Sequence, residues 1–164
     1  MELNTKGRYA VMALADLAKY GVDSDGARKA LPLSVVATRQ GLSLAYLEQL
    51  FAKLRRDGLV ESVRGRAGGY RLARDPDVIV IGDIMASVEE GIRMTRCAPG
   101  DAPCLGRERC LTHDLWVALG STLSSFLFAV TLDDVVSGRL RGAAASGVGP
   151  QAEQPATSAS QVPR

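Results

Sequence analysis

Residues 34–72, SVVATRQGLSLAYLEQLFAKLRRDGLVESVRGRAGGYRL, decide the fold of this chain. The first part predicts two short helices, since Ser34 can cap one that ends at Gly41 and Ser43 can cap the next. Two short helices joined by a turn that contains glycine are typical of a helix-turn-helix. The second helix is amphipathic, and its predicted apolar face consists of Leu47, Leu50, Phe51 and Leu54.

The second part of this stretch predicts a β-hairpin. Residues 59–63 alternate like a strand, residues 64–69 form a basic turn rich in glycine, and residues 70–72 return as a second strand. A helix-turn-helix followed by a basic hairpin is typical of a winged helix, whose wing arginines hold phosphates or enter the minor groove. The glycines match neither the Walker pattern nor GxGxxG, which disfavours a nucleotide-binding loop.

We expect the outward face of the second predicted helix and the wing to meet DNA. The alternative interpretation of the helix pair is an ordinary corner with a solvated polar face. Charge favours DNA, because residues 1–75 hold 13 Lys and Arg against 8 Asp and Glu, whereas the remainder holds 7 against 10. The DNA-contact candidates are Ala45, Tyr46, Glu48, Gln49, Lys53, Arg56, Arg64 and Arg66.

Helical patterns flank this stretch on both sides. Thr5 predicts the start of a helix that Gly21 ends, and residues 82–90 predict another helix. A longer helix is predicted from about Thr112 to Ala129, with an apolar seam at spacings of three and four. The seam either packs on the protein's own core or pairs two subunits, and the shortage of other apolar elements favours a homodimer. The seam residues are Trp116, Leu119, Leu123, Phe126 and Val130.

All three cysteines and the only histidine lie within seventeen residues, as Cys97-x6-Cys104-x5-Cys110-x2-His113. Thiolate and imidazole are preferred ligands of soft and borderline metals, and four of them complete a tetrahedral shell. Prolines and glycines in the segment predict a loop that can fold around an ion or a cluster. The alternative is three buried thiols beside a histidine that caps the long helix. The odd number of cysteines disfavours a disulfide framework.

The composition excludes several classes of protein. The chain has 164 residues, of which 46% are hydrophobic and 23% charged, as in ordinary globular proteins. No run approaches the ~20 apolar residues that span a bilayer, and the N-terminus lacks the apolar core of a signal peptide. We therefore expect a cytoplasmic protein without membrane contact. Because the one histidine belongs to the metal segment, no Ser–His–Asp or Cys–His set remains, and we predict that the chain is not an enzyme.

These patterns predict a mainly α fold: a winged helix-turn-helix with a β-hairpin wing and a long C-terminal dimerisation helix. Residues 1–76 are predicted to form the DNA-binding domain, and residues 77–136 a cluster-binding loop with the dimerisation helix. Thr131 and Asp134 form a capping-box pattern that opens one last helical turn. Residues 137–164 are rich in Ala, Gly, Ser and Pro and are predicted to be a disordered tail.

Over about residues 1–136 the chain resembles the IscR-type family of iron–sulfur-cluster-sensing winged-helix transcriptional regulators. The resemblance rests on the opening LNTKGRYAVMALADLA, on GLSLAYLEQLFAKLRRDGLVESVRGRAGGYRLARDP and on CLTHDLW. Ala45 stands where that family usually has Ser, and the wing reads RGRAGGY instead of RGPGGGY. The gap between the first two cysteines is one residue longer than in that family.

The resemblance implies a homodimer on a pseudo-palindromic double-stranded DNA operator, with long C-terminal helices that cross. It implies control of iron–sulfur-cluster assembly genes, by repression or by activation, with the cluster-assembly machinery as the cluster donor. The DNA contacts that it implies are at Ala45, Glu48, Gln49 and Arg64.

The resemblance also implies a 2Fe–2S cluster held by Cys97, Cys104, Cys110 and His113. Two alternatives stay open for this ligand set. One is a 4Fe–4S cluster, as in nitric-oxide-sensing regulators of the same family. The other is a zinc ion that stabilises a DNA-binding protein, since three Cys and one His also form a structural zinc set.

Overall fold

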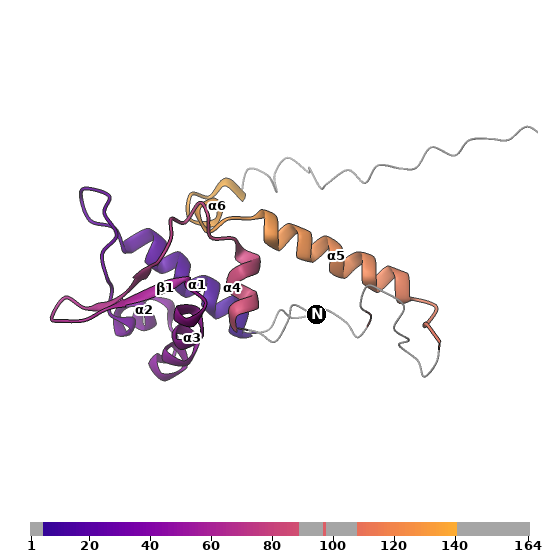
Figure 1. Cartoon of the computed structure of the whole chain (residues 1–164), viewed down its shortest axis with the longest axis horizontal. Helices are drawn as coiled ribbons and strands as arrows, with labels where there is room; N and C mark the ends of the chain where they lie inside the picture. The colour runs from indigo at the N-terminus through magenta and orange to yellow at the C-terminus, as the bar shows by residue number, and fades with distance from the viewer. Residues whose placement is uncertain (1–4, 89–96, 98–107, 141–164) are drawn as a thin grey trace, which may run out of the picture.

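In a computed structural model, which describes residues 5–88, 97 and 108–140, a body of helices and one hairpin carries a projecting helix (Figure 1). The elements in chain order are α1 (Thr5–Tyr20), α2 (Leu33–Gln40), α3 (Leu44–Arg56), β1 (Val60–Val63), β2 (Gly69–Leu72), α4 (Ile81–Val88), α5 (His113–Ala129) and α6 (Leu132–Val136). This order confirms the predicted fold, a mainly α winged helix-turn-helix with a hairpin wing and a long C-terminal helix.

The turn between α2 and α3 is the one that the sequence predicts. Gly41 ends α2 in the left-handed region at φ 64°, where a side chain would be strained. The Leu42 N–H then donates to the Ala37 carbonyl at 2.9 Å, so this carbonyl in the last turn of α2 has a hydrogen-bond partner. The start of α2 differs from the prediction: its N-cap is Pro32 and not Ser34, because the buried Leu33 already belongs to the helix.

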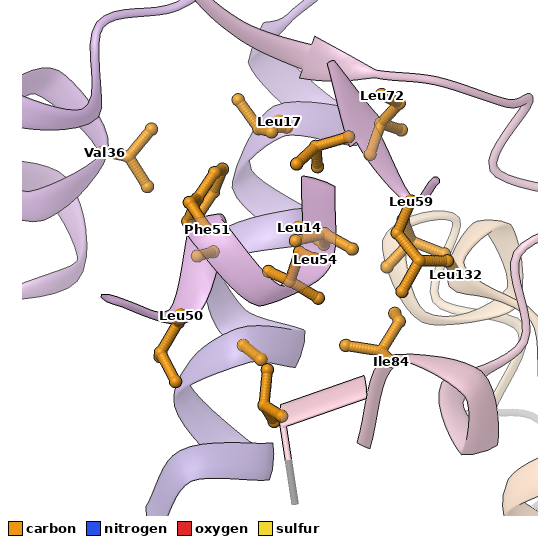
Figure 2. Packing of buried hydrophobic residues seen from close by; sticks show 14 of the residues in the cluster. Leu14, Leu17, Val36, Leu50, Phe51, Leu54, Leu59, Leu72, Ile84 and Leu132 are labelled. Atoms are coloured by element: carbon orange, nitrogen blue, oxygen red, sulfur yellow. The ribbon is translucent and has the colours of Figure 1, made fainter. Parts of the chain in front are cut away.

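The hydrophobic core lies where α3 packs between α1, α4 and the wing (Figure 2). The predicted apolar face of α3 is confirmed, and each of its members is at most 3% exposed. The Phe51 ring also meets the Tyr70 ring edge-on, with ring centroids 5.0 Å apart, which joins α3 to β2. The core residues from α3 are Leu47, Leu50, Phe51 and Leu54.

A buried carboxylate holds α2 against α1. Asp16 is only 2% exposed, and it accepts hydrogen bonds from the Arg39 guanidinium and from Gln40 Nε2. The Arg39 guanidinium also lies 4.6 Å from the centroid of the Tyr20 ring. Because a buried carboxylate without partners is costly, these donors set where α2 sits on α1.

The wing is an antiparallel hairpin in which Val60 pairs with Leu72 and Val63 with Gly69. Leu31, just before α2, pairs with Tyr70 through two backbone hydrogen bonds of 2.9 Å. A Cβ at Gly69 would lie 2.2 Å from the Leu31 carbonyl oxygen, so glycine permits this close approach. The wing is therefore anchored to the chain that enters the helix-turn-helix.

The chain before α4 is joined to the chain after α5. Ile81 N–H donates to the Val130 carbonyl at 2.9 Å, and Leu132 N–H donates to the Ile79 carbonyl at 2.8 Å. The predicted capping box at Thr131 is confirmed, and the backbone N–H of Thr131 is the main cause that lowers the pKa of Asp134 to about 2. The predicted helix 82–90 is found as α4, and its last two residues lie outside the described residues.

The predicted division into three regions stays a prediction. Of the predicted tail, residues 141–164 lie outside the described part of the chain. Ser137 still belongs to the body, because its hydroxyl donates to the Asp133 carbonyl at 2.7 Å.

Candidate functional site

The surface of α3 opposite the core is polar and carries most of the predicted DNA contacts. Packing of one stripe of α3 into the core leaves the other stripe in solvent, since residues three and four apart share a helix face. This exposed face is the surface that a recognition helix presents to the major groove. Its exposed residues are Ala45, Glu48, Gln49, Ala52, Arg55 and Arg56.

Two of the predicted contacts lie at the margins of that face. Tyr46 is half-buried, and its ring meets the Tyr9 ring of α1 edge-on, with centroids 6.0 Å apart. Lys53 is half-buried as well, and its Nζ donates to the backbone carbonyl of Val88 at 3.2 Å. The structure thus turns Tyr46 toward α1 and Lys53 toward the end of α4. Their contacts with DNA stay predictions.

The wing tip is exposed and basic. Arg64 and Arg66 are both exposed between the ends of β1 and β2, and the hairpin extends from the body (Figure 1). A groove of about 490 Å³ separates the wing from the helix-turn-helix. A duplex that lies along α3 would meet the basic wing tip and this groove. The groove is lined by Leu33, Ser34, Leu44, Glu48, Gly69 and Tyr70.

Sequence reasoning missed two exposed cations near this surface. Arg55 lies two helical turns after Glu48 on α3. This spacing in the sequence predicts that Arg55 shares the exposed face with Glu48. Arg8 is exposed near the start of α1, with its guanidinium 5.7 Å from the centroid of the Tyr9 ring. The Tyr9 ring in turn packs on Tyr46 of α3, a tertiary contact that no local sequence pattern predicts.

Two of the predicted metal ligands are adjacent in space. Cys97 Sγ and Cys110 Sγ lie 3.9 Å apart, and both residues are half-buried. A disulfide requires roughly 2.05 Å between the sulfurs, so this pair is not bonded. Two thiolates on one tetrahedral metal, with metal–sulfur bonds of about 2.3 Å, stand about 3.8 Å apart. The separation therefore fits two ligands of one metal atom.

His113, the third described ligand candidate, begins α5. It is only 3% exposed, and its backbone N–H donates to the Cys110 carbonyl at 3.0 Å. The N-cap of α5 is Thr112, whose hydroxyl oxygen accepts from Trp116 Nε1 at 3.1 Å and lies 3.7 Å from Cys110 Sγ. His113 thus occupies the first helical position and is not the helix cap. Cys110 stands beside a helix N-terminus, whose dipole favours a negatively charged group.

The fourth ligand candidate, Cys104, lies outside the described residues. Within residues 5–88, 97 and 108–140, no group of three metal-ligating side chains comes together. The donor set itself, three thiols and one imidazole, suits a cluster of iron and sulfide or a zinc ion. The ligand set as a whole stays a prediction.

The apolar seam of α5 is largely exposed. α5 projects from the body and meets α4 near its own C-terminal end (Figure 1). Trp116 and Phe126 are 37% and 55% exposed, and Leu119 and Leu123 are half-buried. Val130 differs from the other seam residues, because it is buried in the core of the body.

A winged helix-turn-helix with an exposed recognition face and basic wing defines a class of DNA-binding transcriptional regulators. Within this class the chain belongs to the Rrf2 family, because the family model described as an iron-dependent transcriptional regulator matches residues 3–138. The family consists of regulators, and the prediction that the chain is not an enzyme is confirmed.

Curated relatives narrow the class to IscR-like regulators. The chain is 47% identical over 137 residues to the HTH-type transcriptional regulator IscR of Yersinia enterocolitica. The matched region covers 84% of this chain and 80% of that protein. It is 48% identical over 136 residues to the regulator of the same name in Vibrio atlanticus, covering 83% of this chain and 75% of that protein. The predicted resemblance is thereby confirmed.

Solved structures support the same assignment. CymR, the global cysteine regulator of B. subtilis, is 34% identical and superposes with a TM-score of 0.69, covering 84% of this chain and 97% of CymR. IscR of T. potens is also 34% identical, with a TM-score of 0.65, covering 92% of this chain and 94% of that one. None of the described helices is both long enough and apolar enough to span a membrane.

We predict different consequences for substitutions at the wing and on α3. Arg64→Ala should weaken DNA binding by about 1–3 kcal/mol if the side chain enters a groove or pairs with a base. Glu48→Ala should instead change the preferred sequence, because a carboxylate accepts from cytosine but repels phosphate. Binding measurements on a panel of operator variants test both. Uniform and equal losses across all sequences would remove Glu48 from the residues that discriminate between bases.

Proposed function

We propose that this chain is a dimeric transcriptional regulator whose DNA binding is controlled by a 2Fe–2S cluster on Cys97, Cys104, Cys110 and His113. In this proposal the regulated genes are those for iron–sulfur-cluster assembly. The observation that carries it is the 3.9 Å separation of Cys97 Sγ and Cys110 Sγ beside the buried His113. Sequence identity of nearly one half to IscR regulators supports it.

The ligand set suits a sensor. Three thiolates and one neutral imidazole place less negative charge on a cluster than four thiolates, and histidine ligation raises the reduction potential. The fraction of the protein that carries the cluster depends on the supply of iron and sulfide and on oxidants. The dipole of α5 offsets the remaining negative charge near Cys110, since this residue lies just before the N-terminus of that helix. Because the ligands must be deprotonated to bind, occupancy also depends on pH.

The exposed seam of α5 supports a homodimer. Large apolar side chains such as Trp116 and Phe126 are exposed on a helix that projects from the body (Figure 1). A patch of this kind marks an interaction site, and a second copy of α5 would cover it with the same residues. A two-fold dimer would present two α3 helices to successive half-sites of a pseudo-palindromic operator.

The DNA-contact set follows from exposure and chemistry. We place Glu48, Gln49 and Arg56 of α3 in the major groove or on its phosphates, with Ala45 against a base methyl or the backbone. Arg64 and Arg66 of the wing contact the adjacent phosphates or the minor groove. The protein works in the cytoplasm in this proposal, where DNA is present, thiols stay reduced, and the cluster-assembly machinery can deliver the cluster.

A zinc ion is the second candidate occupant, because a sulfur separation of 3.9 Å suits zinc as well as iron. A 4Fe–4S cluster, as in nitric-oxide sensors, is the third. The colour of the protein purified under nitrogen separates zinc from iron, since zinc is colourless. The ratio of iron to protein separates the two cluster types.

We predict that the four ligands act as a unit. Replacement of Cys97, Cys104 or Cys110 by Ala should abolish the visible absorption, because a missing thiolate exposes an iron to water and oxidant. His113→Ala should shorten the lifetime of the cluster in air, and His113→Cys should lengthen it and lower its potential. Absorption spectra, decay rates and redox titrations of protein purified anaerobically measure these effects. Circular dichroism should show the winged helix folded in every variant.

An unchanged spectrum and decay rate in both His113 variants would remove the imidazole from the ligand set. The 4Fe–4S and zinc alternatives would then be preferred. A cluster that is present but has no effect on DNA affinity would contradict the regulatory part of the proposal alone.

A second prediction concerns the dimer. Leu123→Asp should yield monomers or aggregates, because it places an unpaired carboxylate within the apolar seam. Ser121→Asp is the matched control, since Ser121 is exposed on the same helix and outside the seam. Analytical ultracentrifugation at micromolar concentration measures the outcome. A wild-type protein that sediments as a stable monomer would exclude the homodimer.

A further inference from the structure

Both chain connections between the cysteine–histidine group and the body lead to α4. On one side, Val88 ends α4 and precedes Cys97 by nine residues in the sequence. On the other side, α5 carries His113 at its start and ends at Ala129. The carbonyl of its C-cap, Val130, accepts from the Ile81 N–H at the start of α4. The Phe128 ring of α5 also packs so closely on Gly82 that a Cβ there would lie 2.6 Å from it.

One side chain joins the far end of α4 to the recognition helix. Lys53 projects from the margin of α3, and its Nζ donates to the Val88 carbonyl at 3.2 Å. Lys53 of α3 therefore bonds to α4 at the last of its described residues, which precedes Cys97 by nine residues in the sequence.

A weaker contact lies one helical turn further along α3. Asp57, the C-cap of α3, and Ser87 of α4 line the same open pocket. The Ser87 hydroxyl is the main cause that lowers the pKa of the Asp57 carboxyl. The Ser87 oxygen is nevertheless buried without a partner at full hydrogen-bond geometry, so the Lys53–Val88 bond is the stronger polar link between the two helices.

We propose that Lys53 is a positioning residue that couples the state of the cysteine–histidine group to the recognition helix, and that it is not a phosphate contact. This inference rests on the proposed function and deepens it. A change at the group reaches α4 through α5, because the chain just after α5 is bonded to Ile81 and the Phe128 ring packs on Gly82. Because the Val88 carbonyl is bonded to Lys53, that change is passed to α3. Gln49, one helical turn before Lys53 on α3, lies on the exposed face.

The coupling is thermodynamic and therefore reciprocal. If the cluster raises DNA affinity by some factor, DNA raises cluster affinity by the same factor. A residue that carries the coupling changes this factor without contact with either ligand. A residue that binds phosphate changes affinity in both states equally, and it lowers the steepness with which salt weakens binding.

The test compares Lys53→Met, Lys53→Arg and the control Arg56→Met, an exposed cation on the same helix. The probe is a duplex selected from a random library with cluster-loaded wild-type protein. Its dissociation constant is measured anaerobically for loaded and chelator-stripped protein over a range of salt. For the wild type we expect the two forms to differ by about 5- to 150-fold, as is typical of allosteric coupling.

In Lys53→Met, the dissociation constants of the loaded and stripped protein should differ by no more than about twofold, with an unchanged salt dependence. Lys53→Arg should restore the wild-type difference, because arginine also donates to a carbonyl. Arg56→Met should keep the difference and lower the salt slope by about one in both forms. The inference would be overturned if Lys53→Met lowered the salt slope by about one in both forms but kept the affinity difference between the loaded and stripped protein. Lys53 would then be a phosphate contact.

Hydrogen exchange of the stripped protein gives a readout that needs no cluster. DNA should slow exchange of the amides in the last turn of α4 in the wild type and in Lys53→Arg, but not in Lys53→Met. Equal slowing in all three would overturn the role of Lys53, even if the proposed function holds. A wild type whose two forms bind DNA equally would overturn the proposed function and the inference together. Unchanged melting temperatures exclude a folding defect as the cause.

Discussion

The burial of one stripe of α3 is the constraint on which the rest of the structure depends. Leu47, Leu50, Phe51 and Leu54 are nearly inaccessible to water, and burial of side chains of this size stabilises a fold by about 1.5–3 kcal/mol each. α1, α4 and β2 supply the surfaces that cover the stripe. The polar stripe is then necessarily outward, so the packing that stabilises the domain also exposes the predicted DNA-contact face of α3.

The same packing places α4 between α5, which begins at His113, and α3. α4 contacts α1, α3 and α5, and the backbone N–H of Ile81 at its start donates to the carbonyl of Val130, the C-cap of α5. The paired sulfurs of Cys97 and Cys110 lie beside the start of α5, far along that helix from the body (Figure 1). A change at the cysteines therefore has a route to α3 through the contacts of α5 with α4 and of α4 with α3.

Local patterns predicted most of the fold and part of the site. Gly41, the α3 stripe and the Thr131 capping box depend on residues within one or two turns, and the structure confirms them. The orientation of Lys53 depends on its bond to Val88 of α4, 35 residues further along the chain. Helical periodicity alone takes no account of this contact, so it grouped Lys53 with the outward residues of α3. The exposure of Arg55 agrees with helical periodicity, whereas the position of Arg8 depends on packing between Tyr9 and Tyr46.

The central claim is a two-iron cluster with one imidazole ligand, and the single histidine of the chain makes it directly measurable. Protein with ¹⁵N-labelled histidine, loaded and reduced anaerobically, is examined by pulsed electron paramagnetic resonance. The account predicts a signal from a reduced 2Fe–2S cluster with strong coupling to one histidine nitrogen, which can only belong to His113. A four-iron signal, or a two-iron signal without nitrogen coupling, would contradict it.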